Sequence, residues 1–384
     1  MKIYADHAAT TKLDQAAFKA MTPYLLEEYG NASQLYSFAR APKKALKEAR
    51  QTIADCIGAL PEEIFFTSGG TESDNWAIKG TTMLSGEKGG IITSAIEHHA
   101  VLNSCHTCEK MCVPVAYLTV APDGTVKPDT LEHVLDSSTK LVSVMLANNE
   151  IGTIQPIRKL AKIAHAHGSL FHTDAVQALG HIPVNVQELD VDLLSASAHK
   201  FNGPKGIGFL YIRQGTKIAP YSDGGAQEGK LRAGTENIAA IVGMATALKI
   251  SCGAMANRTK HLRRLEQHLL GQLDLYKLDY RKNGSPEHIP GNISLSFKNA
   301  DGEALLHLLD LMGICVSTGS ACNATSTELS HVLKAISLPV EYAYGTIRIS
   351  FGYENTLEEV ETIAESLKKI LTMQYSEKNR LSIL

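Results

Sequence analysis

The sequence predicts an α/β fold, with a large domain built on a seven-stranded, mainly parallel sheet and a smaller α+β domain. Between about residues 60 and 213, short β-rich runs alternate with amphipathic helical segments, an order typical of parallel sheets covered on both faces. After about residue 256 the pattern changes to a long charged helix followed by strands and helices. We therefore expect residues 15–255 to form the large domain, and residues 1–14 and 256–384 to form the small one.

The expected strands of the large domain follow one another along the chain. They cover residues 64–67, 90–94, 114–119, 141–146, 170–173, 192–196 and 207–212. The segments between them show apolar residues at helical spacing, as in the helix that carries Leu160 and Ala164 and stops at Gly168. In the small domain, a helix over residues 258–273 precedes strands at 293–297, 314–317 and 346–351.

The composition excludes several classes of protein. Apolar residues make up 44% and charged residues 20%, which excludes collagen, coiled coil and low-complexity disorder. The formal net charge is −3, and no block of Lys and Arg supports direct nucleic-acid binding. Without a secretory signal pattern or 18 uncharged apolar residues in a row, a cytoplasmic protein with no membrane contact is expected. Seven cysteines, an odd and sparse number, argue against a disulfide framework.

Lys200 follows the strand predicted at residues 192–196. Ser197 and His199 precede it, and a loop rich in Gly and Pro comes next. Burial lowers the pKa of a lysine, so its amine could attack an aldehyde or act as a base near neutral pH. A solvent-facing loop lysine is the alternative. The glycines of this loop match a dinucleotide-binding motif only loosely, so no such site is expected.

Asp174 is expected at the carboxyl end of a strand, which is the edge where open α/β sheets bind ligands. A buried carboxylate needs a cationic partner, and the protonated pyridine nitrogen of pyridoxal phosphate is one such partner. Alternatively, Asp174 caps a helix formed by the residues that follow.

A phosphate site is indicated where the strand at residues 64–67 runs through two glycines into a helix. The free N–H groups at that helix start, from Gly70 onwards, and the hydroxyl of Thr71 would bind a phosphate dianion. The spacing is not that of the nucleotide-binding P-loop, and an ordinary helix start accounts for the segment nearly as well.

The cysteines fall into two groups. Cys322 lies among small and polar residues without apolar periodicity, so we expect an exposed loop in which its thiolate can react. Cys105, Cys108 and Cys112 stand near histidines, as a metal site requires. Their spacing instead places the three sulfur atoms on one face of a helix, so we expect packing and no bound metal.

In their order and spacing, the segments resemble those of the cysteine desulfurases, which are pyridoxal-phosphate enzymes of the aspartate aminotransferase fold, PLP fold-type I. The resemblance extends from residue 4 to about residue 370. The matching segments are YADHAATT, TSGGTESDN, IEHHAVL, NNEIGTIQPI, HTDAVQALG, SAHKFNGPKGIG, RAGTEN, STGSAC and TIRISFG. The length of the segment around Cys322 is similar to that of the branch that supplies iron–sulfur assembly.

The resemblance implies a role for each matching residue. Lys200 would join the cofactor aldehyde covalently and move the Cα proton of the substrate, and Asp174 would pair with the pyridine nitrogen. His98 would stack on the ring and is the nearest candidate base for Cys322, while Gln177 would bond the phenolic oxygen.

Further roles concern the phosphate and the substrate. The residues implied to hold the phosphate are Gly70, Thr71, Ser197 and His199, with Thr235 from the other subunit of a homodimer. Asn149 and Arg348 would bind the substrate α-carboxylate, a task that suits the bidentate geometry of a guanidinium group.

The activity implied is that of an L-cysteine desulfurase, which converts cysteine to alanine and forms a persulfide on Cys322. The sulfur would pass to an acceptor such as an iron–sulfur scaffold or a tRNA-thiolation enzyme. A selenocysteine lyase or an aminotransferase of the same fold is the closest alternative, and neither needs Cys322. A catalytically silent regulatory subunit is a third possibility, although such a protein would be free to lose Lys200, Asp174 and His98.

The chain departs from the usual family pattern at two places. Gly229 and Leu231 precede Arg232 where arginines are common, and Ala32 and Tyr36 stand in a segment that usually reads GNPSS with a following His. These changes affect the N-terminal loop and the side of the active-site entrance that faces the second subunit. The sequence therefore does not predict how the substrate enters or how a partner protein docks.

Overall fold

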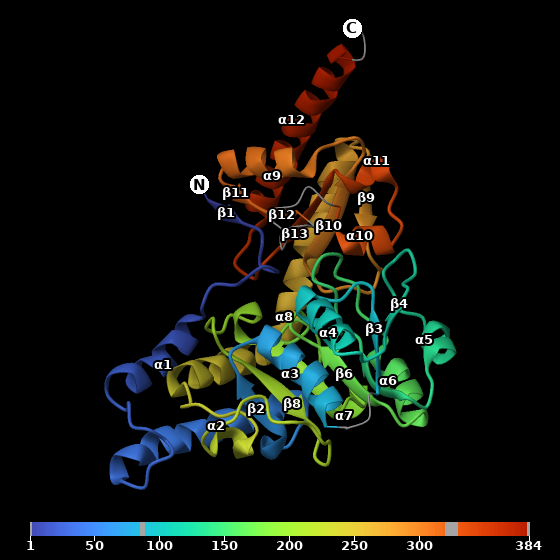
Figure 1. Cartoon of the computed structure of the whole chain (residues 1–384). Coiled ribbons are helices and arrows are strands. Elements are labelled where there is room, and N and C mark those ends of the chain that lie inside the picture. The colour runs from blue at the N-terminus through green and yellow to red at the C-terminus, as the bar shows by residue number, and fades with distance from the viewer. Residues whose placement is uncertain (1, 85–88, 319–328, 382–384) are drawn as a thin grey trace.

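The computed structural model describes residues 2–84, 89–318 and 329–381. A large body holds the seven-stranded sheet and a smaller body holds the remaining strands, and one long helix, α8 (Ile238–Leu275), runs from the first to the second (Figure 1). The N-terminal strand β1 (Ile3–Tyr4) lies with the smaller body, after which the chain crosses to α1 (Gln15–Leu26) of the large one.

The seven-stranded sheet of the large body confirms the predicted fold class. Its strands, in spatial order, are β2 (Ile64–Thr67), β8 (Gly208–Ile212), β7 (Leu193–Ser197), β6 (Leu170–Asp174), β5 (Thr139–Ser143), β3 (Gly90–Ser94) and β4 (Val115–Leu118). Only β8 runs against its neighbours β2 and β7. The other adjacent strands are parallel, so their carboxyl ends meet at one edge of the sheet.

Both faces of this sheet are buried, because successive side chains of a strand point to opposite faces. Ile91 packs with the cluster formed by α3 (Gly70–Met83) and α4 (His99–Lys110), whereas the next residue, Ile92, packs with the cluster on the other side. Leu193 and Leu194 divide in the same way. The apolar runs read from the sequence are therefore strands covered by helices on both faces.

The remaining helices of the large body cover its second face or its ends. They are α2 (Arg40–Ile57), α5 (Pro128–Val134), α6 (Ile157–Ala166) and α7 (Val186–Leu189), with short 3-10 helices at Ser37–Ala39, Pro61–Glu63, Ala198–Lys200 and Gln227–Lys230. Local sequence sets several ends. The Asp14 side chain caps α1 by accepting from the N–H groups of Ala16 and Ala17, and Gly58 ends α2 in the left-handed conformation.

The smaller body contains two sheets. Strand β1 pairs in parallel with β11 (Ile314–Cys315), and the antiparallel sheet has the order β12 (Ser317–Thr318), β13 (Thr346–Ser350), β10 (Asn292–Phe297) and β9 (Tyr280–Asn283). Its helices are α9 (Gly302–Leu311), α10 (His331–Ala335), α11 (Val340–Ala343) and α12 (Leu357–Leu381). The single strand expected at residues 314–317 is thus two short strands in different sheets. The sequence pattern also missed β9, whose residues YRKN are mostly polar.

The charged helix expected at residues 258–273 is the second half of α8, which is 38 residues long. The first half packs Ile241 and Met244 into the core of the large body, and the second half packs Leu265 and Leu269 into that of the smaller one. By length and composition, α8 is long and apolar enough to cross a membrane, but 56% of its most apolar 18-residue stretch is buried inside the protein. Core packing therefore accounts for these apolar residues.

Candidate active site

A cavity of about 330 Å³ opens at the edge where the parallel strands end. Ten of the residues singled out in the sequence line it: Gly70, Thr71, His98, Asn149, Asp174, Gln177, Ser197, His199, Lys200 and Arg348. They come from segments spread over more than half of the chain. The parallel order of the strands brings most of them together, because these residues follow or end strands whose carboxyl ends lie at this edge. Arg348 instead reaches the edge from β13 of the smaller body.

Lys200 reaches the cavity from the 3-10 helix that follows β7. Its Nζ donates hydrogen bonds to the carbonyl oxygens of Ala8, at 2.5 Å, and Ala9, at 2.9 Å. The same oxygen of Ala8 accepts a bond from Nε2 of Gln177, at 2.9 Å. The segment YADHAATT therefore forms one wall of the cavity and holds both side chains.

Asp174 ends β6 and is only 5% exposed. Its Oδ1 accepts a hydrogen bond from the N–H of Val176, at 2.8 Å. Burial raises the pKa of Asp174 to about 6, although this bond and the charge of Lys200 oppose the rise. The helix expected after Asp174 is a series of turns over residues 176–181, so Asp174 caps a turn and also faces the cavity.

The start of α3 forms another part of the wall. Gly69 has φ 151°, a conformation that residues with a Cβ rarely adopt, and it provides no side chain to cap the helix. The first N–H groups of α3 therefore remain available to an anion. A Cβ on Gly70 would lie 2.5 Å from Cγ2 of Val176, so glycine is also required for the close approach of these segments.

His98 and His199 are the two imidazoles that line the cavity. The Nδ1 of His98 accepts a hydrogen bond from the N–H of Ala100, at 3.1 Å, so the proton of the neutral ring lies on Nε2. Nδ1 of His199 lies 3.1 Å from the hydroxyl of Thr10. Burial, and then the nearby charge of Lys200, lowers the pKa of each imidazole to about 4. Both rings are therefore uncharged near neutral pH.

Arg348 extends from β13 of the smaller body to the cavity. Its Nη1 donates to the carbonyl oxygen of Asn149, at 2.9 Å, and its Nη2 donates to Oδ1 of Asp6, at 2.7 Å. Its Nε is buried, and the described residues offer this N–H no hydrogen-bond partner. Arg348 thus ties the two bodies together and keeps a donor for a ligand. Sequence reasoning missed Asp6, although it lies within the quoted segment YADHAATT.

Two predicted residues lie outside this group. Thr235 lines a separate depression of about 210 Å³, together with Glu228 and Arg232. Cys322 falls within residues 319–328, which lie outside the described part of the chain.

The other cysteine prediction was partly wrong. Cys105 and Cys108 are buried on α4, as expected, but Cys112 follows the end of that helix with φ 62° and is exposed. Because Cys112 has a left-handed backbone conformation, it does not continue the helix, and its sulfur atom does not share a helix face with those of Cys105 and Cys108.

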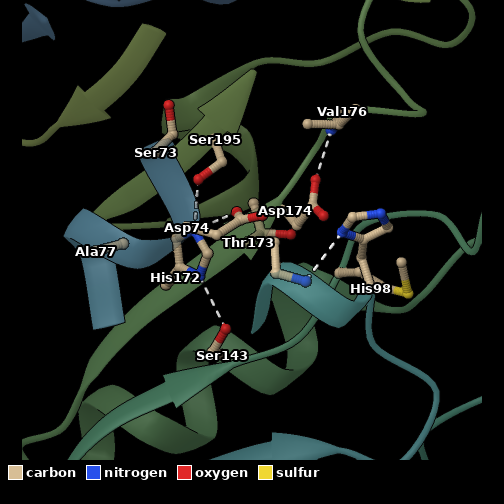
Figure 2. Close-up of polar contacts among 12 residues, drawn as sticks. Ser73, Asp74, Ala77, His98, Ser143, His172, Thr173, Asp174, Val176 and Ser195 are labelled. Atoms are coloured by element: carbon tan, nitrogen blue, oxygen red, sulfur yellow. Dashed lines mark hydrogen bonds and ion pairs between the residues drawn. The ribbon is translucent and has the colours of Figure 1, made fainter. Parts of the chain in front are cut away.

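The sequence also gave no sign of several buried carboxyl groups beside the cavity. Asp74 lies on α3, and Figure 2 shows it near His172 and Asp174. Burial raises the pKa of Glu97 to about 8 and that of Glu150 to about 7. Glu97 accepts from the N–H of Met145, at 3.0 Å. These three acids lie within the quoted segments TSGGTESDN, IEHHAVL and NNEIGTIQPI, but only their depth in the structure distinguishes them from surface acids.

The residues present fit pyridoxal 5′-phosphate. Free N–H groups of α3 with Thr71 and Ser197 suit a phosphate, and the buried carboxylate of Asp174 lacks the cation that a protonated pyridine nitrogen supplies. The amine of Lys200 lines the same cavity and suits an aldehyde. The fold and site therefore define a pyridoxal-phosphate enzyme of fold-type I.

Comparison with known proteins agrees with this class. The family model of the class-V aminotransferases matches residues 3–363. The chain is 49% identical to "Cysteine desulfurase IscS" of Dictyoglomus turgidum over 96% of this chain and 94% of that protein. It is 47% identical to the protein of the same name in Methanosarcina thermophila, over 96% of this chain and 92% of that one. A solved structure titled "NIFS-LIKE PROTEIN" superposes with a TM-score of 0.91 at 38% identity, covering 97% of this chain and all of that chain.

The chain belongs to the class-V aminotransferase family and, within it, to the cysteine desulfurases. Its cofactor is pyridoxal 5′-phosphate.

Proposed function

We propose that this enzyme converts L-cysteine to L-alanine and transfers the substrate sulfur to Cys322, from which an acceptor protein takes it. The placement of Lys200, Asp174 and Arg348 around one cavity carries this proposal, because these three side chains cover the needs of an amino-acid substrate and of the cofactor. Bound pyridoxal phosphate supplies an electron sink that makes the substrate Cα–H and Cβ–S bonds reactive.

Each side chain has a defined task. The guanidinium of Arg348, with its buried Nε still unpartnered among the described residues, binds the substrate carboxylate, and the adjacent Asn149 helps to orient it. The amine of Lys200 takes the proton from Cα and returns protons to the product. Asp174 keeps the ring nitrogen protonated, and the uncharged ring of His98 stacks on the cofactor.

Other residues bind the pyridine ring and the phosphate group of the cofactor. Gln177 bonds the phenolic oxygen. The phosphate is held by Gly70, Thr71, Ser197 and His199, and by Thr235 of a second subunit.

The sulfur transfer balances without an external oxidant. The thiolate of Cys322 attacks the substrate sulfur, a sulfur–sulfur bond forms, and the Cβ–S bond breaks with its electron pair left on the carbon side. Protonation of that carbon gives alanine, so cysteine and the enzyme thiol become alanine and an enzyme persulfide. The outer sulfur atom of the persulfide then passes to an iron–sulfur scaffold or a tRNA-thiolation enzyme.

A homodimer is part of the proposal, and two observations support it. Thr235 lies away from the cavity of its own chain, in a separate depression where it is open to a second copy. In addition, α1 and the segment after it expose a series of large apolar side chains: Phe18, Leu25, Leu26, Tyr29, Leu35, Tyr36 and Phe38. Burial of such a surface against a second copy would contribute to association. Sedimentation should find a dimer, and an active monomer would contradict this part.

A cytoplasmic location is also proposed, because the chemistry requires reduced thiols. The six cysteines of the described residues are all free.

The experiment replaces Cys322 by Ser and uses Cys112→Ser, an exposed cysteine outside the cavity, as the matched control. Wild type and control should release alanine from cysteine and carry one extra sulfur atom on the Cys322 peptide after alkylation without reductant. Cys322→Ser should bind cofactor and cysteine normally and lose nearly all sulfur transfer, because a hydroxyl is a far weaker nucleophile than a thiolate.

Turnover of cysteine by Cys322→Ser at the wild-type rate, or a persulfide on Cys105, Cys108 or Cys112, would show the proposed step to be wrong. Turnover of selenocysteine alone, without need of the thiol, would instead identify a selenocysteine lyase.

A further inference from the structure

Asp74 is a buried carboxylic acid beside the cavity that the roles above leave unused. It lies one turn into α3, is 1% exposed and lines the cavity. Its Oδ1 has no hydrogen-bond partner among the described residues. A buried acceptor without a partner costs folding free energy, so its retention at a ligand site requires an explanation.

The neighbouring histidine does not supply a positive charge. His172 of β6 has a hydroxyl at each ring nitrogen: Oγ of Ser143 lies 2.8 Å from Nδ1, and Oγ of Ser195 lies 2.9 Å from Nε2 (Figure 2). Nε2 is 3.7 Å from Oδ1 of Asp74, and its own hydrogen-bond partner is the hydroxyl of Ser195. Burial lowers the pKa of His172 to about 3, so the ring is uncharged at neutral pH.

Asp74 and Asp174 instead form a pair of acids. One carboxylate oxygen of each and one nitrogen of His98 all lie within 4.8 Å of one another. Two buried carboxyl groups at this separation cannot both ionise cheaply. Burial, followed by the charge of Asp174, raises the pKa of Asp74 well above its usual range, although hydrogen bonding with Ser195 opposes the rise. The groups that face the pair are His172, His98, Glu97 and, beyond Asp174, Lys200.

We propose that Asp74 is a positioning residue that stays protonated and donates a hydrogen bond to the carboxylate of Asp174, so that the pair carries one negative charge facing the cofactor nitrogen. The inference rests on the binding of the cofactor at Asp174 and does not depend on the fate of the substrate sulfur.

This hydrogen bond has a chemical purpose. Burial makes the Asp174 carboxylate more basic, and a more basic carboxylate can take the proton from the ring nitrogen. A hydrogen bond donated by Asp74 stabilises the ionised form of Asp174 and so leaves the proton on the ring. Asp174 can therefore be deeply buried and still face the cofactor as an ionised carboxylate.

Two variants of nearly the same size separate this role from packing. Asp74→Asn keeps an N–H donor toward Asp174, whereas Asp74→Leu removes every donor. In cofactor-loaded protein with ¹⁵N in the pyridine ring, the nitrogen shift should report a protonated ring in wild type and Asp74→Asn. In Asp74→Leu it should move toward the shift of neutral pyridine, and cofactor affinity should fall about tenfold or more.

A second measurement does not depend on the leucine variant folding. The infrared spectrum of wild-type protein at pH 7 should contain a carbonyl band of a protonated carboxylic acid that Asp74→Asn lacks.

Equal carbonyl absorption in wild type and Asp74→Asn would overturn the proposal, as would a protonated ring in Asp74→Leu with unchanged cofactor affinity. An Asp74→Asn protein that matches Asp74→Leu would also overturn it. None of these results bears on Cys322, whose test measures sulfur transfer, so the two proposals can fail independently.

Discussion

Asp174 and Glu266 are buried to a similar extent, 5% and 3% exposed, yet their pKa values shift in opposite directions. Burial raises the pKa of Asp174 to about 6. Burial would also raise that of Glu266, but hydrogen bonds and charges from His288 and Lys282 lower its pKa to about 2. Nζ of Lys282 lies 2.6 Å and Nε2 of His288 lies 2.7 Å from Oε1 of Glu266. Partners that stabilise the ionised form, and not depth, decide the direction of the pKa shift.

The difference matches the position of each carboxylate. Glu266 lies on α8, and His288 lies on a loop that bonds back to the large body, where the N–H of Ile289 donates to the carbonyl oxygen of Gly152, at 3.0 Å. That network is complete within the chain and ties the two bodies together. The carboxylates that line the cavity have raised pKa values instead, which agrees with the proposal that the bound cofactor supplies positive charge at Asp174. Buried carboxylates with raised pKa values thus mark the proposed ligand site. Glu266, which is paired with Lys282 and His288, marks a structural contact between the two bodies, here called the structural joint.

The largest effect is expected where the missing charge matters to the chemistry. Asp174→Asn should keep bound cofactor but lower turnover roughly a hundredfold or more, because a neutral amide cannot hold the ring nitrogen protonated. Steady-state alanine release and the visible absorbance of the cofactor measure the two properties separately. Asp223→Asn, an exposed acid, is the control and should behave as wild type. Near-normal turnover in Asp174→Asn would remove the role assigned to this carboxylate.

The sequence was sufficient to predict most of this arrangement, for a physical reason. Strands rich in β-branched residues were visible as apolar runs, and residues that follow parallel strands must meet at one edge. This argument placed Asp174 at that edge and Lys200 directly after a strand, whereas the place of His98 beside them came only from the family resemblance.

Contacts between distant segments could not be predicted in this way. Nothing in TESDN indicates that Asp74 meets His172, because that contact depends on how α3 rests on the sheet. Likewise, the unbroken course of α8 through the expected boundary at residues 255 and 256 depends on packing against both bodies. The division of the chain into these two domains stays a prediction.

A substitution in the structural joint around Glu266 should lower the stability of the protein and leave its catalytic activity unchanged. Glu266→Gln removes a buried charge from its cationic partners and should lower the free energy of unfolding by about 3 to 5 kcal/mol. Glu361→Gln is the matched control, since Glu361 pairs with His268 at 3.0 Å but is 54% exposed, and its loss should cost less than about 1 kcal/mol. Denaturant unfolding at pH 7 measures both. Equal losses in the two variants would contradict the contrast drawn between buried and exposed pairs.

The smallest effect concerns pH and compares the two carboxylates directly in cofactor-free protein. The pKa of Asp174 is raised on folding, so the folded state holds a proton that the unfolded state has lost between about pH 4 and pH 6. This group therefore costs stability above that window, up to about 3 kcal/mol, and the cost disappears as the pH falls through it. Relative to wild type, Asp174→Asn should become more stable as the pH rises from 4 to 6, and the difference should level off above that.

The reverse sign holds for Glu266. Its pKa is lowered on folding, so its contribution is complete above its usual value of 4.5 and is lost as the pH falls toward about 2. The deficit of Glu266→Gln relative to wild type should therefore shrink on acidification. At pH 8, addition of pyridoxal phosphate should make wild type more stable than Asp174→Asn, which reverses their order without cofactor, because the ring nitrogen then supplies the charge that Asp174 lacks. The lower stability of Glu266→Gln relative to wild type should not change. Unfolding curves of the three proteins, with and without cofactor, test this; a cofactor effect of equal size in all three would show that Asp174 does not face the bound charge.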